Sequence, residues 1–244
     1  MYTSENKGRW PRARCQDVGS PPDGHYPAYF TQPEALDPFG ADGPDLDDLT
    51  AALFLLIRYG YVTPTTFICP STDDKPDTLE GKTRLERSNF ERTDPPGYNL
   101  SYGYCNPYPP FGSQRRFEVG LPPNVFKLPI PGTGGHDYVI AADRNDCIER
   151  FAAWDNQNAP RALMIRMNSQ NHRSAGQNVL YEDGNVRWAD TPFAGIRQDH
   201  IYINGNDGAA AFLPPGIQPS PYNPKDSIIL PVYPIRGRGH YVLP

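Results

Sequence analysis

Residues 178–189 constrain the fold more than any other part of the sequence. Two short runs that alternate between apolar and polar residues meet there at Asp183-Gly184. Asp-Gly is typical of a two-residue hairpin turn, because both turn positions take positive φ. A turn of this kind predicts a β-hairpin in which four apolar side chains share the buried face. This register pairs Tyr181 with Val186 and Val179 with Trp188.

A histidine precedes the hairpin, and related sequence features are spread along the chain. Ten residues separate His172 from Asp183-Gly184. The other segments of interest are 4–11, 67–71, 100–104 and 138–143. Together with the hairpin, they resemble the pilin-like proteins abundant in planctomycete bacteria. Those proteins are labelled prepilin-type processing-associated and carry a His-x9-Asp-Gly motif, one residue shorter than the spacing here.

The resemblance implies an α+β, pilin-like fold, in which a small antiparallel sheet packs on a helix between long loops rich in Pro and Gly. Proteins of this kind, like type IV pilins and type II secretion pseudopilins, are expected to begin with a hydrophobic helix that anchors them in the membrane. No apolar run of about 20 residues occurs in this sequence. We therefore expect a pilin-like head without its N-terminal helix, and membrane contact only through that missing helix.

The resemblance also implies a structural role outside the cytoplasm, at the cell surface, in the periplasm or secreted. The expected subunit acts by self-association, as a homo-oligomer or filament, or by contact with other envelope or secretion proteins. It is not expected to be an enzyme. Two alternatives stay open: a secreted carbohydrate-binding module with Tyr and Trp platforms, and an envelope hydrolase centred on His172 and Asp183.

Composition indicates a folded protein with many loops. The 29 Pro and 22 Gly make up about a fifth of the 244 residues, yet 15 Tyr and 11 Phe argue against disorder. We expect one globular head over 1–244, with an irregular N-terminal arm at 1–44 and a Pro-rich C-terminal strap at 192–244. The net charge of −5 argues against nucleic acid as a partner.

Local patterns predict one helix and several strands. Asp45 and Gly60 suit the two ends of a helix over 46–59, whose apolar residues recur at helical spacing. Charged residues fill the segment 71–96, which we expect to be a solvated surface. Besides the hairpin, the predicted strands are 65–69, 100–105, 138–142, 161–167 and 226–230.

The four cysteines, Cys15, Cys69, Cys105 and Cys147, contain no Cys-x2-Cys pair, which argues against zinc. In an exported protein, they allow up to two disulfides with three connectivities. Cys69 with Cys105 is the favoured pair, because each ends an apolar, strand-like run. Buried free thiols are the alternative.

His172 and Asp183 suggest an acid–base pair, but the sequence offers no recognisable nucleophile or catalytic motif beside them. The structural interpretation is therefore preferred. In it, His172 bonds to the backbone of its loop, Asp183 and Gly184 shape the turn, and no residue is assigned to catalysis.

A second candidate site lies in the Asp- and Asn-rich segment 199–208. Clustered side-chain oxygens on a loop that contains glycine suit calcium, which takes six to eight oxygen ligands. Major pseudopilins, which are similar in overall plan, can hold calcium in a C-terminal loop. The candidate ligands are Asp199, Asn204, Asn206 and Asp207. The same residues are also common turn formers.

Overall fold

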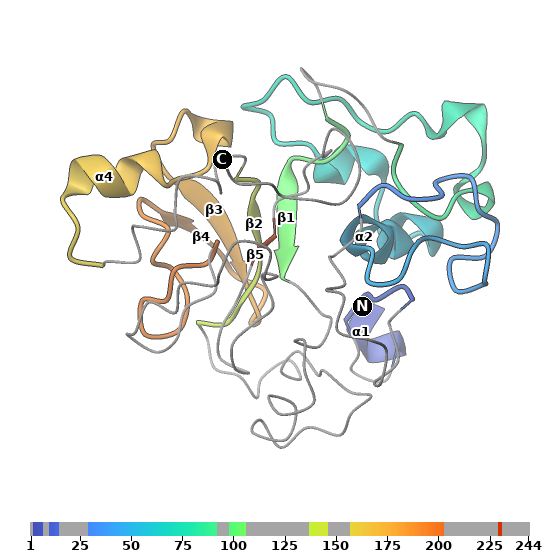
Figure 1. Ribbon diagram of the computed structural model, residues 1–244, viewed down its shortest axis with the longest axis horizontal. Coiled ribbons are helices and arrows are strands. Elements are labelled where there is room, and N and C mark those ends of the chain that lie inside the picture. The colour runs from blue at the N-terminus through green and yellow to red at the C-terminus, as the bar shows by residue number, and fades with distance from the viewer. Residues whose placement is uncertain are drawn as a thin grey trace, which may run out of the picture.

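The computed structural model describes residues 2–6, 10–14, 29–91, 98–105, 137–145, 157–202 and 229–230. They form a small α+β fold with one antiparallel sheet (Figure 1). The helices are α1 (Tyr2–Glu5), α2 (Leu49–Arg58) and α4 (Arg161–Arg166). Short 3-10 turns are η1 (Pro64–Phe67), η2 (Leu79–Gly81), η3 (Arg84–Glu86) and η5 (Gln170–His172). Among the described helices, none is long and apolar enough to cross a membrane.

The sheet has five strands in the order β4-β3-β2-β1-β5. Their bounds are β1 Tyr102–Cys105, β2 Val139–Asp143, β3 Gln177–Tyr181, β4 Val186–Ala189 and β5 Ile229–Leu230. All neighbouring pairs are antiparallel. Figure 1 shows the sheet beside the segment that carries α2, with α4 on the opposite side of the molecule. One apolar cluster joins the two parts, running from Leu53 and Phe54 of α2 to Val139 and Val179 of the sheet.

Helix α2 begins three residues after the predicted start, because Asp48 rather than Asp45 caps it. The carboxylate of Asp48 accepts a hydrogen bond from the backbone N–H of Ala51 at 2.8 Å. It is fully buried and also accepts from Thr31, whereas Asp45 is exposed. Gly60 ends the helix as predicted, with φ of 78° and its N–H bonded to the helix.

The hairpin is present, but its predicted register is wrong by one residue. Its turn has three residues, and Gly184 lies in the left-handed region at φ 84°. The N–H of Gly184 donates to the Tyr181 carbonyl. The extra loop residue pairs Leu180 with Val186 and shifts β4 by one position. Each β4 side chain therefore points to the opposite face. Val179 and Tyr181 are buried as predicted, whereas Val186 and Trp188 are 63% and 51% exposed.

Two predicted strands are helical. Pro64 begins η1, and since proline fixes φ and cannot donate to a ladder, the expected strand over 65–69 does not form. Residues 161–166 form α4 directly after Pro160, because Ala, Leu and Met favour a helix where no neighbouring strand competes. The strands at 100–105, 138–142 and 226–230 are present in part as β1, β2 and β5.

The charged segment 71–96 is not simply a solvated surface. Arg87 is fully buried and pairs with Glu91 at 3.0 Å and with buried Asp77 at 3.9 Å. Asp74 is also buried and forms an ion pair with Arg144 at 3.1 Å. The pattern of charged residues in the sequence could not predict this burial. Burial depends on the opposite charge or hydrogen-bond donors that the fold places beside each buried charge.

His200 is a buried titratable group in the core. Its Nδ1 accepts a hydrogen bond from the backbone N–H of Tyr202 at 3.2 Å, and its ring packs edge-on against Phe193. Burial lowers the pKa of His200 from 6.5 to about 3. The folded protein therefore holds this imidazole neutral across the range in which the unfolded chain protonates it.

We predict that His200 makes folding sensitive to acid. Because its pKa is lower in the folded state, its contribution is full above about pH 6.5 and is lost as the pH falls toward 3. Between about pH 7.5 and 5, the wild type should lose about 2 kcal/mol more unfolding free energy than His200→Gln. Urea unfolding at the two pH values measures this difference, and equal losses in both proteins would contradict the prediction.

Candidate functional site

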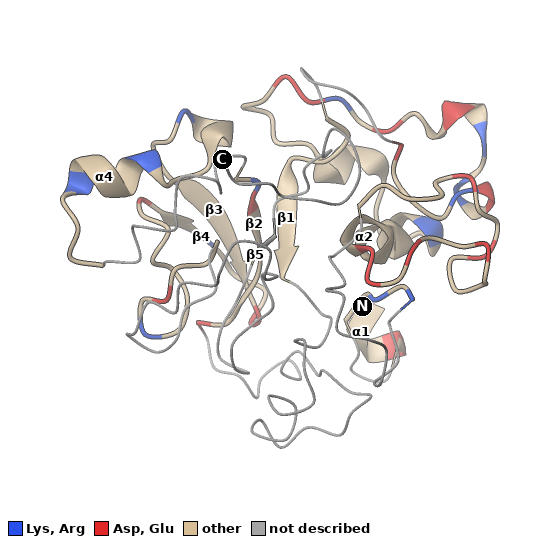
Figure 2. Ribbon diagram, viewed as in Figure 1, with Lys and Arg blue, Asp and Glu red and all other residues tan. Residues whose placement is uncertain are grey.

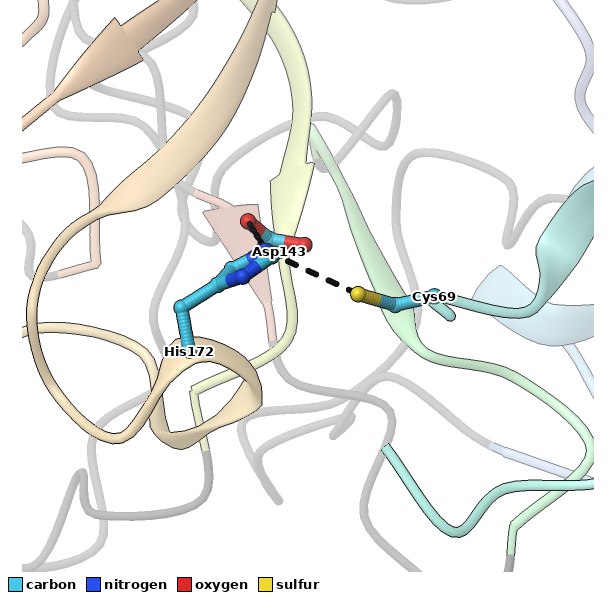
Figure 3. Close-up of side chains that lie close together, drawn as sticks. All are labelled: Cys69, Asp143 and His172. Atoms are coloured by element: carbon cyan, nitrogen blue, oxygen red, sulfur yellow. Dashed lines mark hydrogen bonds and ion pairs between the residues drawn. The ribbon is translucent and has the colours of Figure 1, made fainter. Parts of the chain in front are cut away.

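Three side chains from distant parts of the chain converge beside the sheet: Cys69, Asp143 and His172 (Figure 3). The Nε2 atom of His172 lies 3.6 Å from Cys69 Sγ and 3.2 Å from Asp143 Oδ2. All three donor atoms lie within 4.8 Å of one another. We refer to these three residues as the Cys–Asp–His cluster.

Cys69 is held by the turn that follows η1. Its carbonyl accepts hydrogen bonds from the backbone N–H and the hydroxyl of Thr72, at 3.1 and 2.9 Å. Two residues earlier, the carbonyl of Phe67 accepts from the N–H of Ser101 at 2.8 Å, just before β1. The turn is thus fastened to the sheet, and the thiol points toward the end of β2 (Figure 3).

Asp143 is the last residue of β2 and lies opposite Tyr102 of β1. Its carboxylate is fully buried. Oδ2 accepts from the backbone N–H of Asn178 at 2.5 Å and from its side chain at 3.2 Å. Oδ1 accepts from Asn171 Nδ2 at 3.1 Å. These bonds tie the end of β2 to the loop that carries His172 and to β3.

His172 is the last residue of η5, in the loop before β3. Ser169 caps this turn by accepting from the N–H of Asn171 at 3.1 Å. The ring of Trp188 packs edge-on against the imidazole, with centroids 5.1 Å apart. A Cβ at Gly176 would lie 2.6 Å from the Trp188 ring, so the indole reaches this position because residue 176 is a glycine. The His172 side chain is 20% exposed and gives the cluster its opening to solvent.

Two tyrosines lie beside the cluster. Burial, together with the neighbouring Cys69 and Asp143, raises the pKa of Tyr102 to about 12. Tyr202 is fully buried and donates its hydroxyl proton to the carbonyl of Asp143 at 2.8 Å. In the described part of the chain, His172 is the one side chain that forms an ion pair with Asp143.

The pair of His172 and Asp183, considered as an alternative from the sequence, is not assembled. Asp183 lies in the hairpin turn, where its carboxylate accepts from the N–H of Asn185 at 2.9 Å and pairs with Arg187 at 3.3 Å. His172 instead contacts Asp143. Asp183 and Gly184 do shape the turn, but the expected bond from His172 to the loop backbone is wrong, because the described contacts of its ring are to side chains.

The predicted disulfide between Cys69 and Cys105 is wrong. Both residues are buried free thiols. Cys69 faces His172, while Cys105 lies 3.5 Å from the hydroxyl of Tyr138. The two cysteines therefore have different neighbours, and the alternative prediction of buried free thiols is confirmed for both. Cys15 and Cys147 lie outside the described residues.

The predicted calcium loop is described only at its start. Asp199 lies in a turn in which its carbonyl accepts from the N–H of Gly195 at 3.0 Å. The other candidate ligands, Asn204, Asn206 and Asp207, lie outside the described residues. Calcium binding there stays a prediction.

The Cys–Asp–His cluster was not predicted from the sequence, although the sequence contains a signal for it. Cys69 lies in segment 67–71, Asp143 ends segment 138–143, and His172 begins the hairpin motif. All three segments had been selected for the family resemblance. Search rules based on short ligand spacings could not join them, because 103 positions separate Cys69 from His172.

Comparison with known proteins adds no relative: no family model matches the chain, and searches of curated proteins and of solved structures returned no match.

We predict that Asp143, and not Asp183, is the structurally critical carboxylate near the hairpin. Asp143→Ala should lower the free energy of unfolding by about 3 kcal/mol, because it leaves buried N–H donors without an acceptor. The control, Asp183→Ala, should cost less than about 1 kcal/mol, since the partners of that carboxylate, Asn185 and Arg187, are exposed and can bond to water instead. Urea unfolding at neutral pH measures both, and similar losses would contradict the assignment.

Proposed function

We propose that this protein is a pilin-like structural subunit, located outside the cytoplasm, that works by self-association. The observation that carries the proposal is the exposed apolar strand β4 at one edge of the sheet. Val186 and Trp188 lie on the same face of this strand and are 63% and 51% exposed, with one part of the Trp188 ring packed on His172. Exposed edge strands with apolar side chains favour pairing with another chain.

The position of β4 suits such an interaction. It is the outermost strand next to β3, and in the described ranges no further strand pairs with its outer edge. Acidic and basic residues concentrate in the loops around α2, whereas the strands carry few charges (Figure 2). A second copy of the chain could add a strand or pack its own apolar face here, because Arg187, the one charged residue of β4, already pairs with Asp137 and Asp183.

The arrangement of the resemblance segments also supports a pilin-like protein. Segments 67–71, 100–104 and 138–143 are far apart in the sequence, yet they meet around the Cys–Asp–His cluster. Their side chains fill the core or fasten loops to the sheet, which is a scaffolding role. The segments that resemble the pilin-like family would then form the framework of the globular head that such proteins share.

The described tyrosines lend less support to a carbohydrate-binding module. Half of them are in the core rather than on an open platform: Tyr98, Tyr104, Tyr138, Tyr181 and Tyr202. The hydrolase alternative loses its expected pair, because His172 and Asp183 have different partners. We therefore assign no catalytic role in the proposed function.

We predict that the protein self-associates and that Val186→Lys weakens this association. Burying one valine contributes about 1.5 kcal/mol or more, so the dissociation constant should rise at least about 10-fold. The matched control is Leu36→Lys, at a residue that is 69% exposed on the α2 side of the molecule. Sedimentation velocity across a wide concentration range, with electron microscopy, measures both variants. A wild type that stays monomeric at every concentration would refute the proposal.

A further inference from the structure

We propose that the Cys–Asp–His cluster binds one divalent transition-metal ion of the zinc class. The ligands are Sγ of Cys69, Nε2 of His172 and a carboxylate oxygen of Asp143, with the fourth position open to water. The inference rests on this cluster alone and does not depend on whether the protein self-associates.

His172 Nε2 lies against three polar side chains and cannot form a hydrogen bond with all of them. Besides the thiol and the carboxylate, Asn178 Nδ2 lies 3.1 Å from the same nitrogen. The carboxylate can only accept and the amide nitrogen can only donate, so no single tautomer of His172 suits both contacts. The amide orientation of Asn178 is set independently, because its Nδ2 also donates to Asp143 Oδ2 at 3.2 Å.

A cation between the ligands removes this conflict. A neutral imidazole, a thiolate and a carboxylate can all direct electron pairs at one ion. The Asn178 amide then donates to Asp143 alone. Asn171 holds the other oxygen of the same carboxylate at 3.1 Å, so two amides orient the ligand from behind, as outer-shell partners do in metal sites.

The distances fit a small tetrahedral ion. With sulfur at about 2.3 Å and nitrogen or oxygen at about 2.0 Å from the metal, tetrahedral ligands are about 3.5 Å apart for sulfur and nitrogen and about 3.3 Å apart for nitrogen and oxygen. The corresponding separations here are 3.6 Å from Cys69 to His172 and 3.2 Å from His172 to Asp143. Modest movement of the thiol would complete the site, since all three atoms lie within 4.8 Å of one another.

The donor set selects the class of metal. A sulfur ligand and an imidazole disfavour calcium and magnesium, which prefer oxygen, while the carboxylate disfavours purely soft ions such as Cu⁺. Zn²⁺ and its spectroscopic substitute Co²⁺ accept all three ligand types. Three protein ligands with a partly exposed histidine leave room for a water molecule and a path for the ion.

Cobalt binding tests the proposal directly. Chelator-treated protein without a histidine tag is titrated with Co²⁺ and then with Zn²⁺, and absorbance and isothermal titration calorimetry are recorded. We expect one equivalent of Co²⁺ to bind with a thiolate-to-cobalt charge-transfer band, and Zn²⁺ to displace it. Failure of the wild type to bind one equivalent, or binding without that band, overturns the proposal without any variant.

Variants then locate the ion. Cys69→Ser and His172→Gln should abolish the charge-transfer band or weaken binding by about 100-fold or more, because each removes a ligand. Cys105→Ser is the matched control at another buried free thiol and should bind like the wild type. Far-UV circular dichroism identifies variants that fail to fold. Full binding in folded Cys69→Ser and His172→Gln would place the ion elsewhere and overturn the assignment.

Discussion

Buried carboxylates that accept hydrogen bonds from loop amides hold this fold together. A chain with few and short regular elements leaves many backbone N–H groups without a ladder partner, and each one that is buried needs an acceptor. Four buried aspartates supply such acceptors in the described part of the chain. They are Asp48, Asp74, Asp77 and Asp143. Asp48 caps α2, Asp74 accepts from the N–H of Tyr98, Asp77 accepts from Leu79 and Glu91, and Asp143 accepts from Asn178.

This use of aspartate explains why the candidate site lies where it does. Asp143 must be buried at the end of β2 to fasten β3 and the His172 loop, and the same carboxylate then brings negative charge next to a thiol and an imidazole. Asp74, by contrast, is neutralised by Arg144. Among the described residues, Asp143 lies within ion-pair distance of His172 alone. The thiol and the imidazole beside Asp143 are what distinguish the cluster from the network around Asp74.

The family resemblance predicted the class of fold, and local periodicity with Pro, Gly and Asp signals predicted most strands. These local signals failed where tertiary contacts decide between local alternatives. The Asp183-Gly184 signal located the hairpin, but not whether its turn has two or three residues, so the faces of Val186 and Trp188 were reversed. The charges of Arg87 and Asp74 indicated solvent, whereas their partners allow burial. Cys69 and Cys105 fitted a disulfide by pattern, yet each contacts a different side chain.

Because its residues are far apart in the sequence, the cluster can bind an ion only when the chain is folded. Cys69 and His172 are 103 positions apart, so their meeting has a large loop-closure entropy cost that only the rest of the fold can offset. Zinc sites built from Cys-x2-Cys pairs retain two neighbouring ligands even in an unfolded chain. Here the unfolded chain holds no such pair among these residues. An ion bound at this cluster would therefore recognise the native state alone, and its entire binding free energy would favour the folded protein.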